Sequence, residues 1–71
     1  RQKRACIVRL LLDARAAAAP GLDEAAVLRA LNDAEAAAGR PEVDVSVARS
    51  ILTDLEREGF CHQDQGVWQI V

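Results

Sequence analysis

The most informative part of the sequence is Val43-Asp44-Val45-Ser46-Val47-Ala48-Arg49-Ser50-Ile51-Leu52-Thr53-Asp54-Leu55-Glu56-Arg57-Glu58-Gly59-Phe60. Its larger apolar side chains recur at helical spacing, at Ala48, Ile51, Leu52 and Leu55. Asp44, or Ser46 one step later, is a suitable N-cap, and Gly59 is a suitable C-terminal stop. The stretch therefore predicts a helix with one buried face and one polar face left to solvent.

Beyond Gly59 the apolar period changes from helical spacing to two. Residues 60–63 and 67–71 read as two short strands, and Asp64-Gln65-Gly66 reads as the turn between them. The glycine of this turn suits a position that needs a positive φ. We expect the two aromatic residues, Phe60 and Trp68, to close the bottom of the helical core.

Two further helices are predicted before this region. An apolar stripe predicts the first over about residues 3–18, ending at Pro20-Gly21; its members are Cys6, Ile7, Leu10, Leu11 and Ala14. Asp23 is the expected N-cap of the second helix, and Leu22 and Val27 have the spacing of a hydrophobic staple. The second helix ends at Gly39, and its stripe consists of Val27, Leu28, Leu31 and Ala34.

The length and composition of the chain limit the classes of protein to which it can belong. The chain has 71 residues, of which 51% are hydrophobic and 28% charged, with a formal net charge of −2. This length fits one small domain over residues 1–71, and it is too short for a TIM barrel or a full dinucleotide-binding domain. A domain this short buries only about 60% of its unfolded surface, so we expect modest stability or a stabilising partner.

No stretch approaches the roughly 20 continuous apolar residues of a membrane span, so no membrane partner is expected. The basic start followed by an apolar run imitates a signal peptide, but Asp13 and Arg15 interrupt that run. We therefore expect a cytoplasmic protein.

The order helix, helix, helix, hairpin is the layout of a winged helix-turn-helix. Together with Ile7-Val8-Arg9-Leu10-Leu11-Leu12 and Gly66-Val67-Trp68, the stretch at 43–60 resembles small winged-helix proteins of Mu-like phages and prophages, which are related to arsenic-repressor-type regulators. The resemblance implies a mainly α, α+β fold, duplex DNA as the partner and a role in transcription regulation. We also expect a two-fold homodimer, because one small domain buries too little surface for tight specific DNA binding. In two respects the chain departs from that pattern: residues 34–42 exceed a tight helix-turn-helix turn, and comparable proteins usually continue into a further helix, so we expect a trimmed domain.

In this reading the third helix enters the major groove. Its outward residues are Ser46, Arg49, Ser50, Thr53 and Arg57. Arg49 is the best base-reading candidate, since a guanidinium binds guanine in a bidentate manner, and the hydroxyls suit phosphate or base-edge contacts. The plainer interpretation is an ordinary solvated face, because three acidic residues on the same helix would repel phosphates: Asp54, Glu56 and Glu58.

The N-terminal residues Arg1, Lys3 and Arg4 form a cluster of positive charge that would contact phosphates, unless the terminus is simply frayed. The predicted wing, by contrast, contains no Lys or Arg between His62 and Gln65. Gln63 and Gln65 could still donate hydrogen bonds to a minor groove.

A metal site is the next possibility, because Cys61, His62 and Asp64 lie close in sequence, with Cys6 as a further ligand. A closed zinc site needs four ligands, and strand alternation points Cys61 and His62 to opposite faces, so a core cysteine is favoured. The chain has one His, no Tyr and no glycine-rich phosphate loop. We therefore predict no metal, cofactor, small-molecule substrate or enzymatic activity.

Two other functions remain open. The same helix face could dock a partner protein or a second copy without DNA, which the acidic balance and uncharged wing favour. In that case Val45 and Val47 would lie in the contact, and serine at both positions would abolish it. A structural module of a larger protein is the third possibility.

Overall fold

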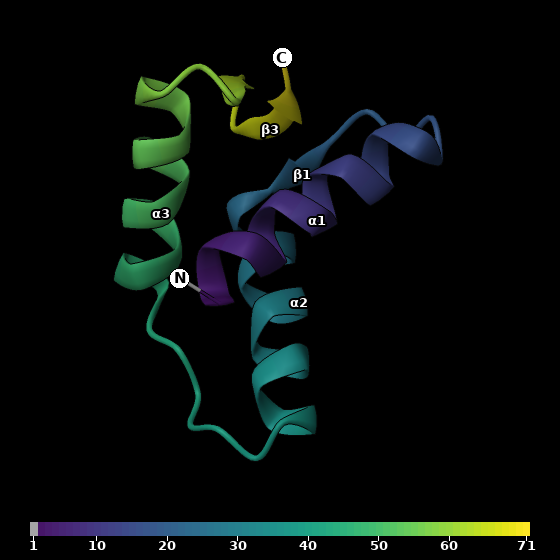
Figure 1. Cartoon of the computed structure of the whole chain (residues 1–71). Coiled ribbons are helices and arrows are strands. Elements are labelled where there is room, and N and C mark those ends of the chain that lie inside the picture. The colour runs from purple at the N-terminus through teal and green to yellow at the C-terminus, as the bar shows by residue number, and fades with distance from the viewer. Residues whose placement is uncertain (1) are drawn as a thin grey trace.

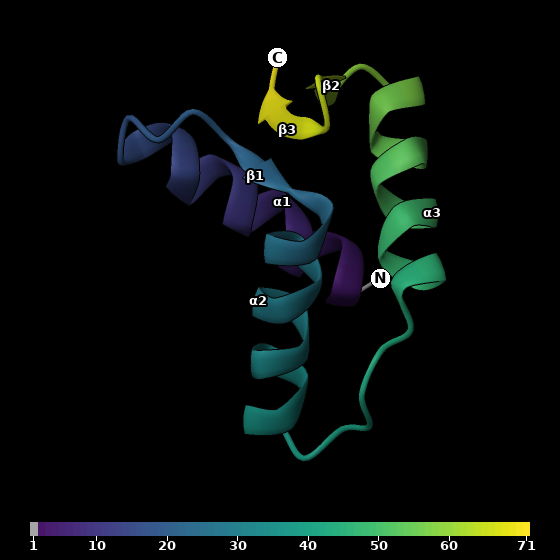
Figure 2. The same cartoon turned by 180° about the vertical axis from the view of Figure 1, so that it is seen from behind.

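The computed structural model describes residues 2–71, and this part of the chain forms three helices and three strands (Figure 1). Their order is α1 (Gln2–Ala16), β1 (Leu22–Asp23), α2 (Glu24–Ala37), α3 (Val45–Arg57), β2 (Cys61–Asp64) and β3 (Val67–Ile70). The expected mixed α+β class is confirmed. Seen from both sides, α2 and α3 are joined by a long loop at one end of the molecule, and the sheet lies at the other end (Figures 1 and 2).

The two later helices begin where the sequence places their caps. Asp23 accepts a hydrogen bond from the backbone N of Ala26 at 2.7 Å, and Asp44 accepts one from the backbone N of Ser46 at 3.0 Å. After α2 and α3 come the predicted glycines, Gly39 with φ 74° and Gly59 with φ 86°. These capping predictions are confirmed, because a cap depends on its own few residues.

The core takes one stripe from each helix. Its buried members are Ile7, Leu11, Val27, Leu31, Val43, Ala48, Leu52, Leu55, Cys61 and Trp68. One position of the α2 stripe is wrong: Ala34 is exposed, and Glu35 is the buried residue at that end of the helix. The backbone N of Arg40 donates to the Glu35 carbonyl, and its guanidinium contacts the Glu35 carboxylate, so the burial of this charge is compensated.

The prediction for Phe60 is also wrong. Trp68 lies in the core as expected, but Phe60 is 51% exposed. Phe60 follows the left-handed Gly59, and its backbone N closes the end of α3 by donating to the Leu55 carbonyl at 3.0 Å. It stands in the turn out of α3, before β2 begins, so strand alternation does not direct it into the core.

The sheet has a third strand that the sequence analysis did not predict. The strand order is β1-β3-β2, with Leu22 paired to Trp68 and Asp23 to Val67 in antiparallel register. Gly21 permits this pairing: its φ is 125°, and a Cβ there would lie 2.6 Å from the Trp68 carbonyl oxygen. The expected hairpin of β2 and β3 is confirmed, with a two-residue loop instead of three.

The long connection between α2 and α3 is fastened to α2 near both of its ends, through Arg40 and Glu35 at its start and through Asn32 and Val43 before α3. The Asn32 side chain accepts a hydrogen bond from the backbone N of Val43 at 2.6 Å and donates one to the Val43 carbonyl at 3.2 Å. Val43 is itself buried. The segment that departs from a tight helix-turn-helix turn is therefore tied to α2 just before α3 starts.

Candidate nucleic-acid interface

All five predicted outward residues of α3 are exposed, and together with Asp54 they line one shallow hollow of about 310 Å³. We call this surface the α3 face; its residues are Ser46, Arg49, Ser50, Thr53, Asp54 and Arg57. The core-facing side of α3 is its Ala48, Leu52 and Leu55 stripe, so the helical period turns the polar residues outward. In Figures 1 and 2 α3 stands at one edge of the molecule.

Both arginines of the α3 face are paired with carboxylates of the same chain. Arg49 donates through Nε and Nη2 to the two carboxylate oxygens of Glu24, at 2.8 and 2.9 Å. This hydrogen bonding raises the pKa of Arg49 and lowers the pKa of Glu24. Arg57 donates to Asp54 at 3.1 Å, one turn back along α3. Both guanidinium groups of the α3 face are therefore already paired with carboxylates of the same chain before any partner binds.

At the start of the face, Asp44 and Ser46 form a local pair. The Ser46 hydroxyl and backbone N both donate to the Asp44 carboxylate, and these bonds lower the pKa of Asp44. The Ser46 hydroxyl is therefore oriented by the N-cap in the free protein. A phosphate approaching the start of α3 would compete with Asp44 for that hydroxyl.

The predicted basic cluster is helical from residue 2 onward, and Arg1 lies outside the described residues. Arg4 donates to both carboxylate oxygens of Glu58, at 3.0 and 2.6 Å, and its guanidinium lies 5.7 Å from the centroid of the Phe60 ring. Lys3 is half-buried, and its charge is among the influences that lower the pKa of Glu35. Arg4 is therefore held at the C-terminal end of α3 by an exposed ion pair and does not form a free basic arm.

The β2–β3 loop places no positive charge beside the α3 face. His62, Gln63, Asp64 and Gln65 are all exposed. The backbone N of Gln63 contacts the Glu56 carboxylate at 3.4 Å. This segment therefore offers amide, imidazole and carboxylate groups to a partner.

The suspected metal ligands do not converge. Cys61 is buried with its sulfur 3.9 Å from the Leu52 carbonyl oxygen, and burial raises the pKa of its thiol, whereas His62 is exposed. Within residues 2–71, no three His, Cys, Asp or Glu side chains gather in a way that could hold a metal ion. In the same part of the chain, no helix has the length and apolar character needed to cross a membrane.

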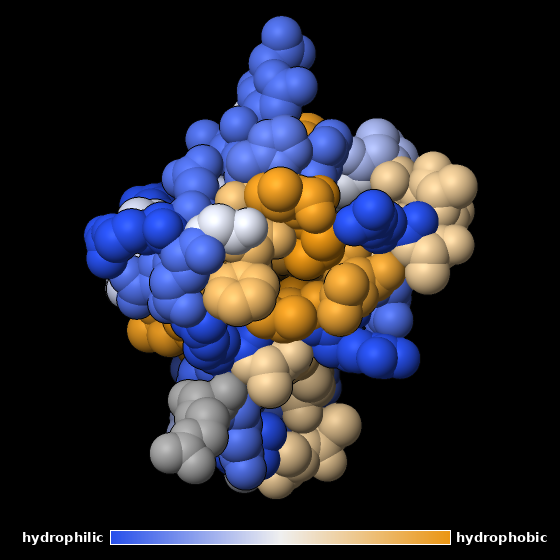
Figure 3. Space-filling model, turned by 45° about the horizontal axis from the view of Figure 1, so that its top comes forward, coloured by the Kyte–Doolittle hydropathy of each residue, from blue (hydrophilic) through white to orange (hydrophobic). Residues whose placement is uncertain are grey.

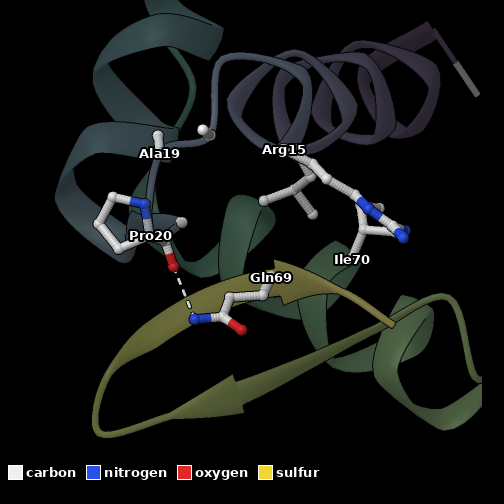
Figure 4. A pocket seen from close by; sticks show the side chains of 8 residues that line it. Arg15, Ala19, Pro20, Gln69 and Ile70 are labelled. Atoms are coloured by element: carbon white, nitrogen blue, oxygen red, sulfur yellow. Dashed lines mark hydrogen bonds between the residues drawn. The ribbon is translucent and has the colours of Figure 1, made fainter.

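A second hollow, of about 340 Å³, lies between the end of α1, the loop after it and β3 (Figure 4). Gln69 donates to the Pro20 carbonyl at 2.6 Å, and Arg15 donates to the Val71 carbonyl at 3.4 Å. Among the described residues that line this hollow, Arg15 alone is charged. These contacts hold the loop against β3 and provide no acid–base pair for catalysis.

Comparison of the chain with known protein families, curated proteins and solved structures finds no match. The α3 face is the surface that the structure assembles from the predicted site residues. Sequence reasoning found five of its six members through the helical period, and did not place Asp54 on it. It missed the pairing of Arg49 with Glu24, because the two residues are 25 positions apart.

Proposed function

We propose that the protein binds duplex DNA as a winged helix-turn-helix transcriptional regulator, with α3 in the major groove and β2–β3 as the wing. The observation that carries the proposal is the α3 face, where hydroxyl and guanidinium groups line up on the outer side of a 13-residue helix. The major groove admits one α-helix and displays base edges to such side chains. This role would place the protein in the cytoplasm of a bacterial or phage-infected cell.

The ion pair between Arg49 and Glu24 is compatible with this role because it is accessible. The Arg49 side chain is 59% exposed and that of Glu24 31% exposed. An exposed ion pair contributes little net stability, so a guanine edge or a phosphate can replace the carboxylate. In the bound state Arg49 would contact a base, and the hydroxyls of Ser46, Ser50 and Thr53 would contact phosphates or base edges.

Two substitutions with opposite expected effects test the proposal. Fluorescence anisotropy at low salt measures the affinity for duplex DNA selected by the protein. Arg49→Ala should weaken binding about 5- to 150-fold, whereas Glu24→Gln, which frees the guanidinium, should strengthen it. Arg29→Ala, an exposed charge on α2 outside the α3 face, is the matched control and should change affinity much less.

The outcomes are distinct. Absence of duplex binding by the parent protein at low salt would refute the proposal. Equal losses from Arg49→Ala and Arg29→Ala would show that only net charge matters, which would contradict a reading role for α3. Binding through phosphates should also weaken as salt is added. The logarithm of the binding constant should fall linearly with the logarithm of the salt concentration, with a slope of about −0.9 for each phosphate neutralised.

A second candidate is a protein-interaction module that uses the α3 face without DNA. The observation that favours it is the internal pairing of both arginines on that face, with Glu24 and Asp54. A surface whose charges are already matched suits a polar protein contact more than a polyanion. In this case the parent protein would not bind duplexes, and the opposite effects of Arg49→Ala and Glu24→Gln would be absent.

A further inference from the structure

A second exposed surface lies apart from the α3 face and is apolar. Ala5, Val8 and Leu12 of α1 line a shallow hollow with Arg4 and Arg9 at its rim. The guanidinium of Arg4 lies over the ring of Phe60. Val71 adjoins them, because its backbone N donates to the Phe60 carbonyl at 3.2 Å. We call this surface the apolar face; it consists of Ala5, Val8, Leu12, Phe60 and Val71. Figure 3 shows hydrophobic side chains gathered in one patch with hydrophilic ones around it.

The fold of one copy does not account for this face. The core side of α1 consists of Ile7 and Leu11, which are fully buried. Val8 and Leu12 come one position later in each turn: Val8 is half-buried at the edge of that core, and Leu12, one turn further along, is exposed. The face brings together three of the four large hydrophobic residues most exposed in residues 2–71, namely Leu12, Phe60 and Val71. A contiguous apolar surface of this kind is typical of an interaction site.

We propose that the apolar face is covered by a second copy of the chain, in a two-fold dimer with the two α1 helices antiparallel. The charges beside the stripe favour this partner. Arg9 and Asp13 follow Val8 and Leu12 directly, and both are well exposed. A contact about a two-fold axis must be self-complementary. With the axis beside Leu11, midway between the two residues, Arg9 of each copy faces Asp13 of the other. Within one copy Arg9 Nε lies 3.2 Å from an Asp13 carboxylate oxygen, so the dimer would share this pairing across the axis.

The dimer contact is separate from the proposed DNA contact. The apolar face and the α3 face share no residue, so pairing through α1 leaves both copies of α3 open. Two copies would also enlarge the area available for specific recognition, which is small for a single domain of this size. The dimer does not depend on DNA binding, and it is tested without DNA, so its failure and that of the proposed function are distinguishable.

Sedimentation velocity over a concentration series tests the dimer. The parent chain should sediment with twice the mass of one chain, and Leu12→Glu should sediment as a monomer. Val47→Glu is the matched control, because Val47 is 39% exposed on α3 and Leu12 is 41% exposed on α1. It should remain dimeric. Circular dichroism and Trp68 fluorescence establish that each variant is folded.

Charge reversal identifies the antiparallel arrangement. Arg9→Asp should weaken the dimer at least about tenfold, since it opposes like charges across the axis. The double variant Arg9→Asp with Asp13→Arg should restore it. A parent chain that stays monomeric at every concentration would overturn the proposal and leave the face to a different protein. A dimer that survives Leu12→Glu, or one that the double variant does not restore, would overturn it as well.

Discussion

Ala18 holds a backbone conformation that favours glycine. Its φ is 58°, and the bonds around it, from Ala18 N to the Arg15 carbonyl and from Ala19 N to the Ala14 carbonyl, close the end of α1. In α2 and α3 a glycine occupies the equivalent position. We expect Ala18→Gly to raise the free energy of unfolding by about 0.5–1 kcal/mol, because it removes the strain at Cβ.

Urea unfolding followed by Trp68 fluorescence measures this change. Ala16→Gly, in the last turn of α1, is the control and should lower stability by a similar amount, because glycine is a poor helix residue. Destabilisation by Ala18→Gly would contradict the expected relief of strain.

Glu35 links the stability of the fold to pH. Its hydrogen bond with Arg40 lowers its pKa, as do the charges of Arg40 and Lys3, although burial acts in the opposite direction. A carboxylate whose pKa is lower in the folded state contributes stability above its unfolded pKa. That contribution is lost as pH falls through the folded value. The end of α2 is therefore expected to loosen in acid.

Glu35→Gln tests this coupling. It removes the ion pair, so it should lower the melting temperature at neutral pH. It should also make the decline of melting temperature toward acid pH shallower than in the parent. Thermal melts by circular dichroism across the acid range measure both effects, and Glu42→Gln, at an exposed residue, is the control. Parallel curves for parent and Glu35→Gln would contradict a role for this carboxylate.

At the scale of elements, the pairing of β1 with β3 depends on Gly21. An added Cβ would meet the Trp68 carbonyl oxygen at 2.6 Å and a side-chain carbon of Val67 at 2.7 Å. Gly21→Ala should therefore lower the free energy of unfolding by about 2 kcal/mol or more. Gly39→Ala isolates the cost of positive φ alone, because nothing lies within 4 Å of that position. It should cost about 1 kcal/mol in the same urea titration.

Local features of the sequence predicted the helices and the hairpin well. The caps at Asp23 and Asp44 and the stop at Gly59 are set by residues within one turn, so the sequence contains the whole signal. β1 was not predictable in this way. It has two residues, and its existence depends on β3, more than forty positions away. Phe60 was misplaced because strand alternation was extended one residue into the turn after α3.

In the candidate site, too, the features set by neighbouring residues were predictable and those set by distant residues were not. The helical period of α3 was enough to gather Ser46, Arg49, Ser50, Thr53 and Arg57 on one face. The ion pairs of Arg49 with Glu24 and of Arg4 with Glu58 join residues distant in sequence, and no local pattern indicates them. The first pair sets the charge that the α3 face presents, and the second holds Arg4 away from that face, so the electrostatics of the site required the structure.

At the scale of the whole molecule, a small core and an exposed apolar face link folding to association. A dimer that forms only from folded chains stabilises them by mass action. The midpoint of thermal unfolding should therefore rise with protein concentration for the parent chain. It should be independent of concentration for Leu12→Glu, while Val47→Glu should behave as the parent does. Differential scanning fluorimetry over a hundredfold range of concentration, roughly the span that mass action needs, measures this.

The strand order also has a consequence for how the protein is made. β3 lies between β1 and β2 in space but follows both along the chain. As the polypeptide leaves the ribosome, every helix and both outer strands emerge before the strand that joins them, and Trp68 emerges with that strand. The sheet cannot assemble until this segment has cleared the exit tunnel, so the domain should complete its folding only after all six of its described elements have emerged, with its apolar surfaces briefly accessible to chaperones.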